Sequence, residues 1–279
     1  MNHLTTNSNS HDTLEIVNYL GQCCVKKTFR KNLSRAHQNI EKQINFENIQ
    51  QSDQLIKSVT IIERLISCDK IEIIMPYTEG LNGPSFTLYG TADVAKKIKI
   101  GLEVLLSKEI ANSVEKLIKT SVFQSKLTEI LSATGDVILI NIVRKCQLFL
   151  GNMPDQMLYP VGECHGDLTL SNIILSDNGQ INLIDFLATY LETPLQDIAK
   201  IKQEFKYGWS IRYDENWLAL KGRILGDSAV PNIVEKIDKQ YPIQSKIIMI
   251  VTLARIAPYV KDQITRNWLI KSISSELKI

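Results

Sequence analysis

The chain has 279 residues, of which 44% are hydrophobic and 22% charged, and its formal net charge is +2. This length fits a small domain joined to a larger one, and the near-neutral charge gives no electrostatic case for a nucleic-acid partner. The chain start lacks the basic and apolar regions of a signal peptide, and the longest apolar run, Ile247 to Leu253, is too short to span a bilayer. Five cysteines without metal-ligand spacing suit reduced thiols. We therefore expect a cytoplasmic protein with no membrane insertion.

The first third of the chain has strand and helix patterns. Two runs of β-favouring residues, Leu14 to Leu20 and Cys23 to Phe29, flank Gly21-Gln22 and predict a hairpin. The stretch from Leu33 to Ile66 is helical in pattern. Residues 71–80, Ile-Glu-Ile-Ile-Met-Pro-Tyr-Thr-Glu-Gly, predict an apolar strand that runs into an exposed turn.

Residues 165–185 hold the most informative pattern. Asp167 and Asn172 stand in a D-x-x-x-x-N arrangement, and two apolar runs around Ser-Asp-Asn-Gly predict a hairpin that returns Asp185 to Asn172. Phosphoryl transfer needs a carboxylate beside the attacking hydroxyl, and an amide and a second carboxylate to hold metal ions. The spacing therefore predicts a kinase site, in which Asp167 acts on the acceptor hydroxyl while Asn172 and Asp185 hold Mg²⁺.

The pattern after this hairpin is helical. Thr193 and Pro194 predict a helix start, and further helices are expected over residues 216–224, 232–239, 243–256 and 261–277. From Phe205 onward the chain carries 12 Lys and Arg against 7 Asp and Glu. Because cationic acceptors need acids or aromatic faces, the basic surplus favours a neutral or anionic acceptor, such as a sugar or sugar phosphate. The alternative is that these charges lie on solvated helix faces.

The segments His165-Gly166-Asp167 and Ile184-Asp185-Phe186-Leu187 resemble the catalytic core of the aminoglycoside phosphotransferase and choline kinase group. These are small-molecule kinases that share the protein-kinase fold. The absence of a glycine after Phe186, and of any Ala-Pro-Glu downstream, argues against a protein substrate. The resemblance implies an α+β, bilobal fold, with a β-rich nucleotide-binding lobe and hinge over residues 1–80 and a mostly helical catalytic and acceptor-binding lobe over residues 81–279.

The resemblance also implies individual roles. The hinge consists of Met75, Pro76, Tyr77 and Thr78, where the Pro76 carbonyl accepts from the adenine amino group and the Thr78 amide donates to the ring. Proline fits because it loses only a donor that this position would not use. His165 accompanies Asp167 in the catalytic loop, and Asp197 is the acid that braces this loop. For Asp197 the alternative is a solvated first-turn carboxylate favoured by the helix dipole.

Kinases carry a strand lysine that binds the α- and β-phosphates. Only one of Lys26 and Lys27 can face the nucleotide, because adjacent strand residues face opposite ways, and the Val-Ala-Ile-Lys pattern favours Lys26. A helix glutamate normally orients this lysine, but the family's Lys-Glu-Ile-x-Phe appears here with Gln43 in place of the glutamate. Either Glu41 or Glu47 replaces it, or Gln43 makes a neutral contact.

The phosphate-covering loop has no Gly-x-Gly-x-x-Gly signature. Only the polar residues 5–11 lie where this loop is expected, and Ser8 and Ser10 are its candidates because Ser and Asn amides can line a phosphate; a frayed chain start is the alternative. The sequence thus predicts an ATP- and Mg²⁺-dependent small-molecule kinase, with GTP as the alternative donor. The second hypothesis is a nucleotide-binding regulator on the same fold, indicated by the absent glycine loop and by Gln43. The oligomeric state is not determined by the sequence.

Overall fold

A computed structural model describes residues 12–50 and 55–278. The chain divides into two compact units. The first holds the described residues up to Asn82 together with Asn172–Ala188, and the second holds Gly83–Ser171 and the residues from Thr189 onward. The first is rich in strands and the second is mostly helical, so the expected α+β class is confirmed.

The first unit contains two sheets and one long helix. A four-stranded antiparallel sheet has the order β1-β2-β5-β4, and a three-stranded sheet has the order β3-β9-β8, with β3 parallel to β9. The elements are β1 (Thr13–Tyr19), β2 (Gln22–Phe29), α1 (Leu33–Gln50), β3 (Ile56–Ser58), β4 (Glu63–Ile66), β5 (Ile71–Pro76), β8 (Ile173–Leu175) and β9 (Ile181–Leu183).

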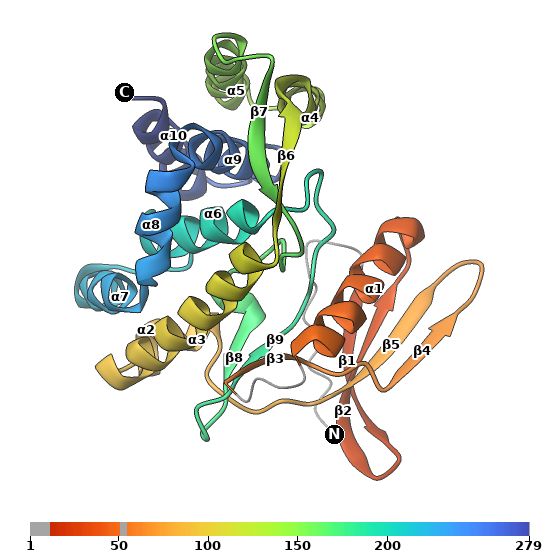
Figure 1. Ribbon diagram of the computed structural model, residues 1–279. Coiled ribbons are helices and arrows are strands. Elements are labelled where there is room, and N and C mark those ends of the chain that lie inside the picture. The colour runs from red at the N-terminus through yellow and green to blue at the C-terminus, as the bar shows by residue number, and fades with distance from the viewer. Residues whose placement is uncertain (1–11, 51–54, 279) are drawn as a thin grey trace. The chain divides into compact units, whose positions relative to one another are not determined.

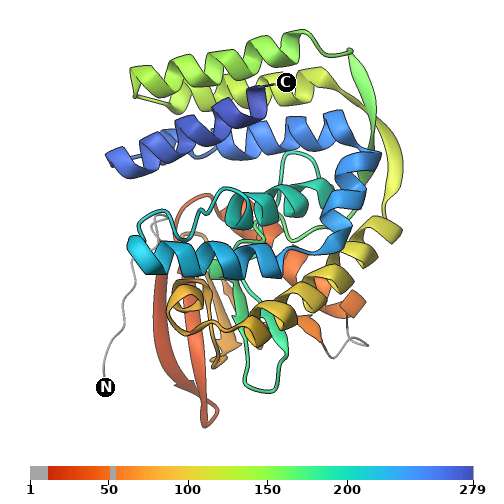
Figure 2. The same cartoon turned by 90° about the vertical axis from the view of Figure 1, so that its left-hand side faces the viewer.

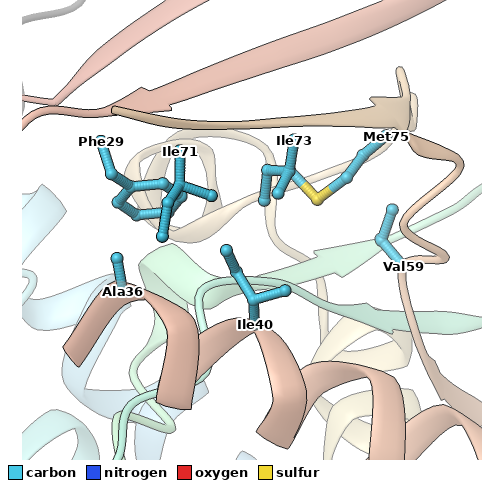
Figure 3. Close-up of a cluster of buried hydrophobic side chains, with 7 residues drawn as sticks. All are labelled: Phe29, Ala36, Ile40, Val59, Ile71, Ile73 and Met75. Carbon is cyan, nitrogen blue, oxygen red and sulfur yellow. The ribbon is translucent and has the colours of Figure 1, made fainter. Parts of the chain in front are cut away.

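The core of the first unit forms where α1 lies against the larger sheet (Figure 1). Side chains of β2 and β5 point toward Ala36 and Ile40 on α1, and Val59 closes one end (Figure 3). Each of these side chains is at most 7% exposed. This packing fixes α1 and β2 relative to each other, and both carry residues of the predicted site. The buried residues of this core are Phe29, Ala36, Ile40, Val59, Ile71, Ile73 and Met75.

The prediction of helix through Ile66 was wrong in its second half. The helix ends at Gln50, and β3 and β4 follow. The segment from Ile56 to Ile62 is rich in β-branched residues, whose stiff side chains favour strands. It also finds strand partners far along the chain, because β3 pairs with β9 and β4 pairs with β5. These tertiary pairings override the helical pattern.

The second unit is a helical assembly with one pair of strands. In Figure 2 the helices α4, α5, α9 and α10 run beside one another. The run from Ile247 to Ala254 on α9 is buried almost completely, so it is a core segment. No helix in the described ranges is long and apolar enough to cross a membrane. The elements are α2 (Gly83–Tyr89), α3 (Ala92–Ala111), β6 (Val114–Lys119), α4 (Thr120–Ala133), α5 (Val137–Gly151), β7 (Gln156–Val161), α6 (Pro194–Phe205), α7 (Asn216–Ala229), α8 (Asn232–Gln240), α9 (Pro242–Ala254) and α10 (Gln263–Leu277).

Candidate active site

The loop that carries Asp167 is held by helix α6 of the second unit. Pro194 opens this helix, and the Thr193 hydroxyl caps it by accepting from the amide of Leu195. The fully buried Asp197, in the first turn, accepts hydrogen bonds from the amides of His165 and Gly166, the latter at 2.7 Å. Asp197 therefore braces the loop as the resemblance implied, and the alternative of a solvated carboxylate is excluded.

His165 lies inside this loop. Its ring is completely buried, and its Nδ1 atom accepts a hydrogen bond from the Asp167 amide at 3.2 Å. The next residue, Gly166, has a φ of +84°, a conformation that glycine adopts without strain. The structure thus places His165 where it positions the backbone of Asp167.

The Asp167 carboxylate forms an ion pair with Lys200 of α6, with 2.9 Å between Oδ1 and Nζ. The side chain of Asp167 is 33% exposed and that of Lys200 only 11%. Burial raises the pKa of Asp167, but the opposing effect of Lys200, with smaller contributions from His165 and Arg255, brings this pKa below its ordinary value. Asp167 is therefore ionised at neutral pH, as an acceptor of a hydroxyl proton must be. Lys200 was not predicted from the sequence, although its spacing of three from Asp197 places both residues on one helix face.

The hairpin of the first unit brings Asn172 to Asp185, as its turn signal predicted. The strands β8 and β9 pair Ile173 with Leu183, and the Ile184 amide donates to the Asn172 carbonyl at 3.1 Å. Asp185 follows directly with a φ of +59°. This left-handed conformation costs a non-glycine residue about 1 kcal/mol or more. The fold maintains Asp185 at this cost, which is typical of functional positions.

Asn172 and Asp185 form a donor set that suits Mg²⁺. One offers an amide oxygen and the other a carboxylate that is 41% exposed, and both are hard ligands of the kind that Mg²⁺ prefers. Across the described residues, no three His, Cys, Asp or Glu side chains cluster to hold a metal ion. Two protein ligands are still sufficient for Mg²⁺, because this ion keeps waters and phosphate oxygens in its coordination shell.

The structure places Lys27, in place of the expected Lys26, beside Asp185. The distance from Lys27 Nζ to Asp185 Oδ1 is 2.7 Å. Lys26 lies on the opposite face of β2 and pairs with Glu15 at 2.7 Å and more loosely with Glu72 at 4.0 Å. These contacts favour Lys27 over the predicted Lys26 as the lysine beside the metal-binding acid.

The hairpin turn accounts for the partners of the two lysines. The chain turns at Leu20 and Gly21, whose φ values are +52° and +81°, and not at Gly21-Gln22. Positive φ at both central residues is typical of a type I′ turn, and it sets a register in which Glu15 faces Lys26 directly. The ion pair with Glu15 across the strands holds Lys26 on one face of the sheet. Lys27, the next residue, therefore lies on the opposite face, where it pairs with Asp185.

Helix α1 contacts the segment that follows Asp185 at three points. The rings of Phe46 and Phe186 lie 4.8 Å apart. The Lys42 ammonium donates to the carbonyl of Leu187 at 2.8 Å, and the Asn39 side chain accepts from the Ala188 amide at 2.7 Å. These contacts fix the backbone on the carboxyl side of Asp185.

Two of the three candidates for the lysine-orienting helix residue have other partners. Glu41 pairs with Arg64. The buried Gln43 donates to the Val59 carbonyl at 2.7 Å and contacts the sulfur of Met75. The side chain of the third candidate, Glu47, lies outside the described part of the structure, as do Ser8 and Ser10.

The predicted hinge begins at the end of β5. The Tyr77 amide donates to the Cys23 carbonyl at 3.0 Å, so Pro76 occupies a position of the β2–β5 ladder whose carbonyl faces away from β2. The pairing with β4 ends at Ile74, so this carbonyl lies beyond the last paired residue on that side. Met75 is buried in the core and Tyr77 is exposed. The register agrees with a role of the Pro76 carbonyl in adenine binding; Thr78 follows just after the strand.

Comparison with known proteins adds independent findings. Residues 134–232 match the model of the phosphotransferase enzyme family. This segment contains the loop with Asp167, the hairpin and α6. The match confirms the resemblance seen in the sequence and the prediction that the chain is a phosphotransferase enzyme. A search of curated protein sequences gave no match.

Solved structures share the fold over nearly the whole chain. A thermostable mutant of the aminoglycoside phosphotransferase APH(4)-Ia, in complex with ADP and hygromycin B, has a TM-score of 0.59 at 11% identity, covering 99% of this chain and 93% of that one. Spectinomycin phosphotransferase APH(9)-Ia, with ADP and spectinomycin, has a TM-score of 0.50 at 12% identity, covering 99% and 87%. A putative fructosamine-3-kinase from Haemophilus somnus has 0.50 at 12%, covering 99% and 91%. At these identities the likeness shows the protein-kinase-like fold.

Proposed function

We propose that the protein is an ATP- and Mg²⁺-dependent kinase that transfers the γ-phosphate to a hydroxyl of a small molecule, with a sugar or sugar derivative as the leading class. The observation that carries this proposal is the pairing of Asp167 with Lys200 on a loop held by Asp197. The nucleotide complexes of the structures that share the fold, with ADP and with AMP-PNP, support a nucleotide donor. The cytoplasm supplies ATP and Mg²⁺, and we place the activity there.

The described residues have separate roles in such a reaction. Asp167 orients the acceptor hydroxyl and takes its proton as the oxygen attacks the γ-phosphorus and the bond to the leaving ADP breaks. Lys27 neutralises phosphate oxygens of the nucleotide, and Asn172 with Asp185 would hold Mg²⁺, which stabilises the charge of the transferring group when it is bound. The Pro76 carbonyl and the Thr78 amide would bind the adenine.

Replacing Asp167 with Asn tests the proposal. We expect Asp167→Asn to lower turnover by about a thousandfold, because the amide cannot accept the hydroxyl proton, while MgATP binding stays within about twofold because this side chain acts on the acceptor. The assay is ATP consumption against a panel of sugars, amino alcohols and aminoglycosides. Asp227→Asn, an exposed change on α7, is the matched control. Turnover in Asp167→Asn close to that of the control would refute the role of Asp167.

A nucleotide-binding regulator on the same fold is the second candidate. It is favoured by Gln43, which replaces the expected glutamate and is engaged with Val59 and Met75. A regulator would bind MgATP yet consume none with any acceptor of the panel, and Asp167→Asn would leave its properties unchanged. The same assay therefore separates the two candidates.

A further inference from the structure

The second unit contains a pocket of about 320 Å³. It opens among α7, α10 and the connection between α6 and α7, and its size lies at the lower end of the range of small-molecule pockets, roughly 300–1,000 Å³. The lining combines aromatic surface with two arginines, and its residues are Tyr207, Gly208, Ile211, Arg212, Asp214, Ala219, Arg223, Ile264, Asn267 and Trp268.

One of these arginines, Arg212, is held in a fixed orientation. Its guanidinium carbon lies 3.7 Å from the ring centre of Trp209 and 4.3 Å from that of Tyr213. Its Nε donates to the Thr265 hydroxyl at 3.2 Å, and its Nη1 donates to the Trp209 carbonyl at 2.7 Å. These bonds use two of the five guanidinium donors, so the remaining donors are preorganised for a ligand oxygen.

The charge of the lining favours an anion. Arg212 and Arg223 form no ion pair within the described ranges, and the only acidic residue in the lining is Asp214. The lining itself thus holds two guanidinium groups against one carboxylate, and Asp262, outside the lining, interacts electrostatically with Arg212. Planar guanidinium groups bind carboxylate and phosphate oxygens through paired hydrogen bonds.

A single buried carboxylate connects this pocket to the catalytic loop. Glu204 at the end of α6 accepts from the Leu170 amide at 3.3 Å with one oxygen and from the Ser210 amide at 3.2 Å with the other. Leu170 follows Asp167 by three residues, and Ser210 lies in the connection that carries Arg212. The acceptor-activating aspartate and the pocket wall are thus held by the same helix.

We propose that this pocket binds the anionic group of the acceptor, so that the substrate is a small hydroxylated compound carrying a carboxylate or a phosphate. This inference rests on the proposed kinase function and narrows its substrate class. Arg212 and Arg223 bind the anionic oxygens, the indole of Trp268 supplies apolar surface, and Asp167 receives the hydroxyl. An acceptor with several positive charges is excluded, because the two arginines repel it.

Intrinsic fluorescence offers a direct test in the absence of nucleotide. The chain has three tryptophans; Trp268 lines the pocket, and the ring centre of Trp209 lies 5.0 Å from that of Trp268. The full chain is titrated with inorganic phosphate, glucose 6-phosphate, acetate, gluconate, glucose and kanamycin. The phosphate and acetate arms distinguish a phosphate-bearing from a carboxylate-bearing substrate, and glucose is the neutral reference.

We expect at least one of the anions to bind, with glucose 6-phosphate or gluconate binding about tenfold or more tightly than glucose. Arg212→Gln and Arg223→Gln should each weaken the binding of that anion by about tenfold, since each removes a charged donor. Arg144→Gln on α5 makes the same charge change away from the pocket and should have no effect. Arg223 is exposed and packs little, so its variant stays informative even where Arg212→Gln disturbs the fold.

Three results would overturn the inference: no binding by any anion of the panel, glucose binding as tightly as its charged derivatives, or unchanged anion affinity in Arg223→Gln. Salt-sensitive binding of kanamycin would also contradict it, because it would show an acidic pocket. Binding of MgATP, measured separately on the same variants, reports on the kinase proposal itself. The pocket inference can thus fail while nucleotide binding persists.

Discussion

Two lysine–carboxylate pairs, one in each unit, hold the acids of the predicted site in different ways. The Asp167–Lys200 pair depends on one helix, because α6 supplies both Lys200 and the loop-bracing Asp197. The Asp185–Lys27 pair joins residues 158 positions apart in the chain, one on β2 and the other after β9. The first pair is thus supported by local helix geometry, and the second depends on the packing of the whole first unit.

The two acids also differ in backbone conformation. The loop at Asp167 places its positive φ on Gly166, where it costs little. The turn after β9 places the positive φ value on Asp185 itself. A residue held in a strained conformation by surrounding contacts suits a position whose oxygen atoms must point at a metal. We infer that the Asp167 pair favours a stable ionised base, and that the Asp185 pair favours a fixed direction of the carboxylate.

The largest effect on nucleotide binding is expected from removing the metal-binding acid. Asp185→Ala should weaken Mg²⁺-dependent ATP binding by more than about a hundredfold, because Mg²⁺ at this site relies on very few protein oxygens. Isothermal calorimetry with and without Mg²⁺ measures the change. Asp177→Ala, in the turn of the same hairpin, is the control. An equal Mg²⁺ enhancement in Asp185→Ala and wild type would count against the assignment of Asp185.

Replacing the two adjacent lysines of β2 tests which one faces the nucleotide. Lys27→Met should lower kcat/KM by about a hundredfold, since it removes a charged donor from the phosphates. Lys26→Met breaks only a part-exposed pair with Glu15 and should change kcat/KM by less than about threefold. Steady-state kinetics of both variants measures the two losses in kcat/KM. A larger loss in Lys26→Met than in Lys27→Met would show that Lys26 binds the phosphates.

The brace of the catalytic loop is expected to affect stability. Asp197→Asn should lower the free energy of unfolding by about 2 kcal/mol, because the new amide group can no longer accept from both the His165 and Gly166 amides in a buried site. Chemical denaturation measures this change, with Asp227→Asn as the control. A variant as stable as the control would show that the loop does not depend on Asp197.

Sequence predicted those parts of the site that depend on neighbours in the chain. The Asn178-Gly179 turn signal predicted the pairing of β8 with β9, so the approach of Asp185 to Asn172 followed from spacing. Asp197 followed from resemblance and its place in a first helical turn. In the hairpin a few adjacent residues determine the geometry, whereas the contact of Asp197 with the loop spans more than thirty residues and was implied by the resemblance alone.

The sequence-based predictions failed where the structure depends on contacts between residues that are far apart in the chain. The choice of Lys26 rested on a local Val-Ala-Ile-Lys pattern, whereas the partner of each lysine depends on strand pairing and on the distant Asp185. The strands β3 and β4 form because β9 and β5 offer partners, which no local pattern records. The role of Lys200 and the pocket lined by Arg212 and Arg223 were not predicted. Both depend on how the helices pack against the loops, which the sequence does not show. The basic surplus after Phe205 did, however, already point toward a non-cationic acceptor.

The smallest effect is expected from replacing Lys200. Lys200 opposes the burial that raises the pKa of Asp167 and holds this pKa below its ordinary value. Lys200→Met removes that opposition, so the pKa of Asp167 should rise and a smaller fraction of it should be ionised at a given acidic pH. The acidic limb of the pH profile of kcat/KM should therefore move to higher pH, with a loss of about tenfold or less on the plateau.

Two further variants separate this electrostatic role from a packing role. Lys202→Met on the same helix breaks the pair with Asp238 and should leave the pH profile in place. Lys200→Arg keeps the positive charge beside Asp167 and should restore most of the profile. If Lys200→Met lowers kcat without moving the acidic limb, the lysine only packs against the loop. Such a result would mean that Asp167 does not depend on Lys200 for its charge, and the contrast drawn between the two pairs would then rest on backbone conformation alone.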